Sequence, residues 1–160
     1  MAQPVARDFS YQTLYEEEFF FTSALQHEYA QAKTLKIADL ANQPILLLEE
    51  GHCLREQAMA VCKMAKNNEI ADFTATSLET LRLMVQAGMG VTLLPALATL
   101  AQSSNLLAYI PFVKPAPSRT LALFWRPGSP KTPCLRAIAQ CISELIEPKL
   151  KKLSHAMHAQ

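Results

Sequence analysis

The stretch PILLLEEGHCLREQAMAVCKMA, residues 44–65, encodes a short strand that is followed directly by a helix. Its four consecutive apolar residues, 45–48, are typical of a strand that is covered on both faces. Gly51 and His52 then predict a tight turn, and the segment from Cys53 onward predicts a helix. A strand that leads straight into a helix is the unit from which α/β folds are built.

The rest of the chain continues this alternation, so we expect an α/β fold in which a mixed sheet is flanked by helices. Residues 11–25 predict strand structure interrupted at the acidic cluster 16–18, and Ser77 is a typical N-cap for the helix after it. The remaining strands are expected at 72–77, 91–96, 106–113 and 119–127, and the helices at 34–43, 78–87 and 133–153. The last residues, 154–160, should form a frayed tail.

The composition is typical of a soluble globular protein, with 160 residues of which 50% are apolar and 18% are charged. A net charge of +1 gives no global electrostatic basis for binding nucleic acid or a membrane. The N-terminus lacks the apolar segment of a signal peptide, and no apolar run reaches the roughly 18 residues that span a bilayer. We therefore expect a cytoplasmic protein, in which four cysteines are too few to indicate a disulfide scaffold.

Cys53 and Cys62 lie nine residues apart within the predicted helix. On a continuous helix this spacing separates them by about 13.5 Å along the axis, at about 1.5 Å per residue, and places them on opposite sides. A disulfide needs Cα atoms about 4.4–6.8 Å apart. If these two thiols form a bond, the helix between them must therefore come apart.

The two thiols also differ in their expected surroundings. Cys53 lies at the predicted helix N-terminus, where the helix dipole favours a thiolate, and His52 and Arg55 are adjacent. Cys62 lies in mid-helix and is expected to be buried. An accessible reactive thiol with a buried partner is typical of a peroxidatic cysteine and its resolving cysteine. Two small structural residues of a core are the alternative, and the spacing leaves both interpretations open.

Other candidate groups have simpler interpretations. Cys134 and Cys141 share one face of the C-terminal helix, too far apart to bridge, and we interpret both as buried structural residues. The acidic cluster 16–18 is interpreted as a polar strand edge. The four histidines show no metal-ligand spacing, and no cofactor is expected. A small-molecule site near Ser77 is a generic alternative for a sheet of this kind.

Three segments carry a resemblance to a known family: LEEGHCLREQAMAVC (48–62), ATSLETLRLMVQAGMGVTLLPAL (75–97) and RPGSP (126–130). Together they closely resemble the regulatory domain of OxyR-type regulators, the peroxide-sensing members of the LysR family of transcription regulators. The first segment is specific to that subgroup, and the second is a general LysR signature. The resemblance covers residues from about 11 to 144.

The resemblance implies a peroxide-sensing disulfide switch. Cys53 matches the peroxidatic cysteine, which would form a sulfenic acid, and Cys62 matches the resolving cysteine, which would then close a disulfide with local refolding. His52 and Arg126 match groups near the reactive thiol, and Ser77 matches a position that often contacts an effector in LysR relatives. The implied function is regulatory rather than enzymatic. A thiol peroxidase and a LysR domain for a small organic ligand are the alternatives.

The resemblance also implies partners and a subdomain organisation. Hydrogen peroxide would be the signal, thioredoxin or glutaredoxin the reductant, and a homodimer the assembly, with helix 78–87 near its interface. DNA would be bound only through a domain that this chain does not contain, and no membrane is involved. The family has two α/β subdomains of the periplasmic-binding-protein type. The expected division is a remnant of the first subdomain and a crossover at 1–19, the second subdomain at 20–117, a return to the partial first subdomain at 118–153, and a tail at 154–160.

Overall fold

The structure, a computed structural model, describes residues 9–67, 69–100 and 106–158. In these residues the strands are β1 (Ser10–Ala24), β2 (Ile45–Leu48), β3 (Ile70–Ala75), β4 (Thr92–Pro95), β5 (Leu107–Pro111) and β6 (Ser118–Trp125). The helices are α1 (Cys53–Met64), α2 (Leu78–Gln86), α3 (Ala96–Leu100), α4 (Thr132–His158) and the 3-10 helix η1 (Ile37–Leu40). The helix expected at 34–43 is thus reduced to η1, because Asn42 takes a left-handed φ of 65° and Pro44 follows.

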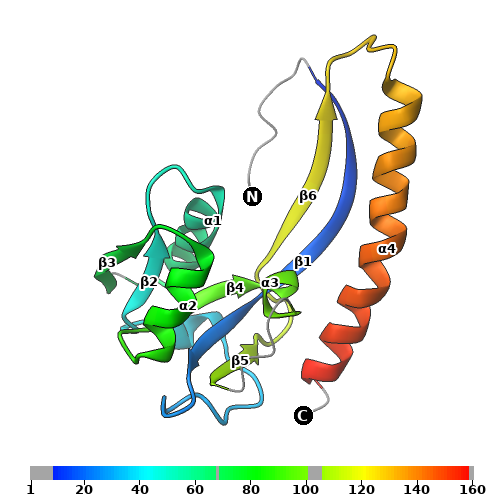
Figure 1. Cartoon of the computed structure of the whole chain (residues 1–160). Coiled ribbons are helices and arrows are strands. Elements are labelled where there is room, and N and C mark those ends of the chain that lie inside the picture. The colour runs from blue at the N-terminus through cyan, green and yellow to red at the C-terminus, as the bar shows by residue number, and fades with distance from the viewer. Residues whose placement is uncertain (1–8, 68, 101–105, 159–160) are drawn as a thin grey trace.

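Strand β1 joins the two parts of the molecule (Figure 1). Its first half pairs antiparallel with β6, and its second half pairs antiparallel with β4 on one edge and with β5 on the other. Strands β2 and β3 form a parallel pair, and a bridge between Ile45 and Val91 joins this pair to the beginning of β4. The expected mixed sheet flanked by helices is therefore confirmed.

The apolar run in β2 is explained by helices on both faces of the sheet. Ile45 and Leu47 belong to the core cluster that includes α1, whereas Leu46 and Leu48 belong to the cluster that includes α2. All four side chains are buried. Because alternate residues of a strand point to opposite faces, an uninterrupted apolar run follows from this two-sided packing.

Strand β1 is continuous through the acidic cluster 16–18, so the predicted interruption is wrong. Glu17 is buried, and its cross-strand partner on β6 is Arg119. The guanidinium of Arg119 neutralises the Glu17 carboxylate, which lets a buried strand contain this acid. The interpretation of the cluster as a polar strand edge is wrong for Glu17. The compensating arginine lies 102 residues away in the sequence, so local propensity could not reveal it.

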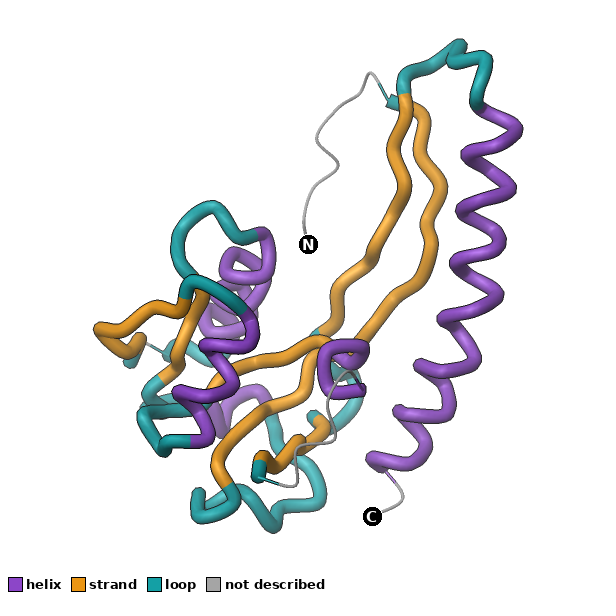
Figure 2. Tube along the Cα trace, viewed as in Figure 1, coloured by secondary structure: helices purple, strands orange, loops and turns teal. Residues whose placement is uncertain are grey.

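Helix α4 lies alongside the β1–β6 ladder (Figure 2). The hydroxyl of Ser143 donates to the carbonyl oxygen of Leu14 at 2.6 Å, where the register of the ladder shifts. An acceptor at the bulge is thus satisfied by the helix. Ile138 and Leu145 are exposed on α4. The apolar stripe expected on this helix is therefore only partly covered.

The prediction of a frayed C-terminal tail at 154–160 is wrong for residues 154–158, because α4 continues to His158. Leu153 and Met157 pack against the cluster of Phe20, Ala96 and Leu150, which extends the helix beyond its predicted end. Within the described residues, no helix is both long and apolar enough to cross a membrane.

Candidate functional site

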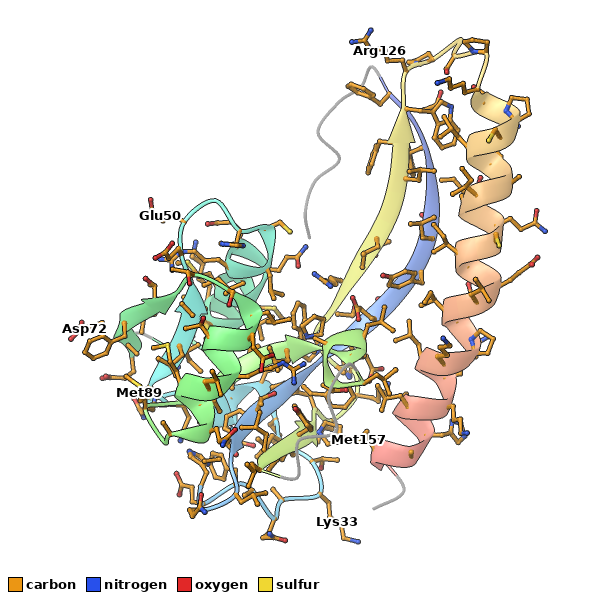
Figure 3. The ribbon with its side chains drawn as sticks, in the orientation of Figure 1. Lys33, Glu50, Asp72, Met89, Arg126 and Met157 are labelled. Atoms are coloured by element: carbon orange, nitrogen blue, oxygen red, sulfur yellow. The ribbon has the colours of Figure 1, made fainter. Side chains whose placement is uncertain are left out.

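Helix α1 begins at Cys53, after β2 and a turn at Gly51; Figure 3 labels Glu50 at this turn. Gly51 has a φ of +92°, which a residue without a Cβ atom adopts without strain. His52 is the extended N-cap residue, and its side chain makes no capping hydrogen bond. Cys53 is exposed, so the sequence correctly predicts an accessible thiol at the start of this helix.

Arg55, one of the two predicted neighbours of the thiol, is bound to the backbone. Its Nη1 donates to the carbonyl oxygen of Leu48 at 2.8 Å, which ties the first turn of α1 to the end of β2. His52 is exposed next to Cys53 in the chain. The turn therefore presents one thiol and one imidazole side by side in sequence, both open to solvent.

Cys62 is buried, with a relative exposure of 2%, as predicted. It belongs to the core cluster between α1 and the sheet, with Ala58 and Val61 from the same helix. Burial raises the pKa of its thiol from 9.0 to about 11, because desolvation disfavours the thiolate. Cys62 is therefore a protonated, protected thiol while α1 is folded.

Both cysteines are free, and one uninterrupted helix, α1, contains them. Nine residues of α-helix separate their Cα atoms by about 13.5 Å along the axis, compared with the roughly 4.4–6.8 Å that a disulfide requires. The described conformation is thus one in which these thiols cannot bond.

The structure does not bring Arg126 to this site. Figure 3 labels Arg126 beyond the end of β6, at the tip of the ladder and far from Glu50 at the turn before α1. Its role near the thiol stays a prediction. The arginine that does contact α1 is Arg119, at the opposite end of β6, whose Nη1 donates to Oε1 of Gln57 at 3.1 Å.

A cavity of about 440 Å³ lies between α1 and the start of β6. Gln57, Val61 and Met64 line it from α1, and Pro117 and Arg119 line it from the other side. Sequence reasoning missed this contact between α1 and β6. The one available signal was an arginine in register with a buried glutamate, and that register is visible only in the folded sheet.

Ser77 is confirmed as the N-cap of α2: its hydroxyl oxygen accepts from the backbone N–H of Thr80 at 3.1 Å. Whether it contacts an effector stays a prediction. The interpretation of Cys134 and Cys141 as buried is wrong, because both are exposed on α4. Helix α4 turns its small residue Ala139 toward the core instead. In the part of the chain that the structure describes, no group of three or more His, Cys, Asp or Glu is placed to hold a metal ion.

Comparison with known proteins identifies the class. The LysR substrate binding domain family matches residues 1–146, so the chain belongs to that family. The architecture agrees, because crystal structures of the reduced and oxidised forms of OxyR superimpose with TM-scores of 0.72 and 0.75.

Within the family, the chain is an OxyR-type regulatory domain. It is 39% identical to the reduced OxyR structure, covering 86% of this chain and 64% of that one, and 41% identical to the oxidised structure, covering 90% and 68%. A curated relative from Escherichia coli, the DNA-binding transcriptional dual regulator OxyR, is 44% identical over 138 residues. That match covers 86% of this chain and 44% of the relative, so the chain spans less than half of the relative's length.

Proposed function

We propose that this chain is the redox-sensing regulatory domain of a transcription regulator that responds to hydrogen peroxide. Cys53 is the peroxidatic cysteine and Cys62 is the resolving cysteine. The observation that carries the proposal is the pair itself: an exposed thiol at the start of α1 and a buried thiol nine residues later in the same helix. Curated relatives from Dickeya chrysanthemi and Haemophilus influenzae have the name "Hydrogen peroxide-inducible genes activator", which supports the proposed response to peroxide.

The proposed reaction has two steps. The Cys53 thiolate attacks one oxygen of hydrogen peroxide, the O–O bond breaks, and hydroxide leaves and is protonated to water. Sulfur is oxidised to a sulfenic acid while peroxide oxygen is reduced. The Cys62 sulfur then attacks the Cys53 sulfenic sulfur, the S–O bond breaks, and a second water leaves as the disulfide forms.

The second step requires α1 to unwind, because its helical geometry holds the sulfurs apart. The resulting loop of about ten residues constrains the segment by about 2–3 kcal/mol in the chain-entropy model. That is enough to bias one helix between two conformations and too little to unfold a whole domain. The oxidation state of Cys53 and Cys62 thereby determines the conformation of α1.

The surrounding residues have proposed roles of different strength. His52 is adjacent to Cys53, and its side chain makes no capping hydrogen bond, so it can orient the thiol or accept its proton. Arg126 would stabilise charge developing on the leaving oxygen only if the tip of β6 approaches α1 in the complete regulator. Ser77 is engaged as a helix cap, and an effector contact there would use the same hydroxyl.

The complete regulator would act as a homodimer whose DNA-binding domain lies outside this chain. Helix α2 is the proposed neighbour of the dimer interface, and Leu83 and Met89 at this helix and its end are exposed, at 56% and 45%. Thioredoxin or glutaredoxin would return the disulfide to thiols.

Titration with hydrogen peroxide tests the proposal against its alternatives. We expect about one peroxide to be consumed per chain, with a Cys53–Cys62 peptide found by mass spectrometry of the non-reduced digest. Sustained consumption with thioredoxin or glutaredoxin would instead identify a thiol peroxidase. Failure of the bridge to form under mild peroxide would exclude both and leave a domain for a small organic ligand.

Single-cysteine variants assign the roles. Cys53→Ser should abolish the response, whereas Cys62→Ser should leave a sulfenic acid at Cys53 that a dimedone probe captures. Cys134→Ser and Cys141→Ser are the matched controls, because both thiols are exposed but lie on α4. Loss of the bridge in either control would contradict the assignment.

A further inference from the structure

Arg119 connects three elements of the molecule. Its Nε donates to Oε1 of Glu17 on β1 at 2.8 Å, and its Nη2 lies 2.7 Å from the same oxygen. Its Nη1 donates to Oε1 of Gln57 on α1 at 3.1 Å. The planar guanidinium is suited to this, because its donors are fixed relative to one another. One side chain of β6 is therefore fixed by β1 and α1 together.

Glu17 lies at the point where β1 changes partners. It is the last but one residue of the pairing with β6, and Phe19 begins the pairing with β4. Its side chain has no exposed surface, and its Oε2 accepts from the backbone N–H of Leu97 at 2.9 Å. A buried carboxylate is stable only while it is paired, so the geometry at this point depends on Arg119.

Gln57 lies inside the segment that the two thiols delimit. It is four residues after Cys53 and five before Cys62, in the half of α1 that must move if the sulfurs are to meet. Bringing the sulfurs together requires α1 to unwind between them, and Gln57 lies in that part of the helix. Unwinding that includes residue 57 removes Gln57 from Arg119.

We propose that the Gln57–Arg119–Glu17 contact transmits the folding state of α1 to the point where β1 passes between its two sets of partner strands. This inference rests on the proposed disulfide switch and adds the route by which it reaches the β1–β6 ladder. In this proposal Gln57 and Arg119 act as positioning residues.

The consequence of breaking the contact follows from the surrounding cavity. Gln57 and Arg119 both line the cavity of about 440 Å³ between α1 and β6, with Val61 and Met64. When α1 unwinds, this wall opens and water reaches the Arg119–Glu17 ion pair. Water weakens the attraction between the two charges, so the pairing of β1 with β6 becomes less stable at the point where β1 changes partners.

The coupling must be reciprocal, because it links two equilibria of one molecule. If the contact exists only while α1 is helical, removing it destabilises the reduced form alone. For a hydrogen bond to a charged group, we expect Gln57→Ala to shift the thiol–disulfide equilibrium of Cys53 and Cys62 roughly tenfold toward the disulfide. In a two-electron couple this corresponds to a potential about 30 mV more negative.

The experiment uses the whole chain with Cys134→Ser and Cys141→Ser, so that only the proposed pair titrates. Thiol and disulfide are quantified by mass spectrometry after equilibration in glutathione buffers. Gln140→Ala is the matched control, because Gln140 is an exposed helical glutamine whose side chain donates to Glu144 on its own helix. In an Arg119→Lys background, Gln57→Ala should add less than about a twofold shift, because lysine lacks the fork that contacts both partners.

A second measurement does not depend on the disulfide. In the fully reduced protein, amide hydrogen exchange at Leu97, whose N–H donates to Glu17, should be faster in Gln57→Ala than in the parent or in Gln140→Ala. This readout separates a transmitted effect from simple loss of α1 stability, since Leu97 makes its contact on the far side of Glu17.

The outcomes separate the two proposals. If the parent forms the disulfide but Gln57→Ala shifts its equilibrium no more than Gln140→Ala does, the transmission is refuted and the switch stands. If the parent forms no Cys53–Cys62 bridge, the switch is refuted together with the redox input of the contact. If amide exchange at Leu97 is unchanged in Gln57→Ala, transmission from Gln57 to Glu17 is refuted, whether or not the disulfide forms.

Discussion

Alkaline pH should weaken this domain through one buried thiol, that of Cys62. Burial raises its pKa from 9.0 to about 11, so in this window the folded state keeps a proton that the unfolded chain has lost. Stability must then fall as pH rises: the contribution is complete below pH 9.0 and is lost on passing through about 11. The pKa difference sets an upper limit of about 2.7 kcal/mol, at about 1.36 kcal/mol per pH unit. Because α1 is a surface helix and water screens part of the effect, we expect about 1–2 kcal/mol.

Urea unfolding of the reduced protein between about pH 8 and 11 measures this loss. Cys62→Ala removes the titrating thiol and loses a packing free energy that does not depend on pH. The difference in the free energy of unfolding between this variant and the parent should therefore change by about 1–2 kcal/mol across this pH range. Burial also raises the pKa of Tyr15, but that group is common to both proteins and cancels. Cys134→Ala, at an exposed position, should run parallel to the parent. Parallel curves for Cys62→Ala and the parent would refute the reasoning.

Four further substitutions are measured as free energies of unfolding in urea. Gly90→Ala would place a Cβ atom 2.5 Å from the carbonyl oxygen of Pro44, so we expect a loss of about 1–3 kcal/mol. Gly88→Ala meets no neighbour and should cost only about 1 kcal/mol for its φ of +75°; equal losses at the two glycines would contradict the close approach. Ser77→Ala removes the N-cap of α2 and should cost about 1 kcal/mol, with no loss indicating that the cap contributes nothing. Asn67→Ala leaves two buried carbonyl groups without the amide that donates to them at 2.6 and 2.9 Å, and should cost about 2–3 kcal/mol; a smaller loss would mean that water replaces the amide.

Local patterns predicted the elements whose causes are local. The strand and helix of residues 44–65 were readable because two-sided burial produces an apolar run and Gly51 supplies the turn. The continuity of β1 could not be predicted from the local sequence. Three consecutive acids oppose a buried strand unless a cation lies across from them, and Arg119 is brought there only by the folded ladder.

In the candidate site, too, only the features with local causes could be predicted from the sequence. Their positions in the predicted helix indicated that Cys53 is exposed at the N-terminus and Cys62 is buried, and both placements are confirmed. The same type of reasoning failed for Cys134 and Cys141, because an amphipathic helix has two faces and the pattern did not show which one β1 covers. The role of Gln57 also escaped prediction, since a glutamine in mid-helix is ordinary until Arg119 is seen opposite it.

The two helices that follow parallel strands begin differently, and the difference indicates which end of α1 opens first. Helix α2 begins at a serine cap, whereas the N-cap of α1, His52, makes no side-chain capping bond. The buried residues of α1, Ala58, Val61 and Cys62, all lie beyond its first five residues. Fraying from the N-terminus therefore loses little burial, whereas moving Cys62 first would expose part of the core. We expect Cys53 to travel to Cys62, with amide exchange faster at the start of α1 than at its end, so that Gln57 leaves Arg119 before the core around Cys62 is disturbed.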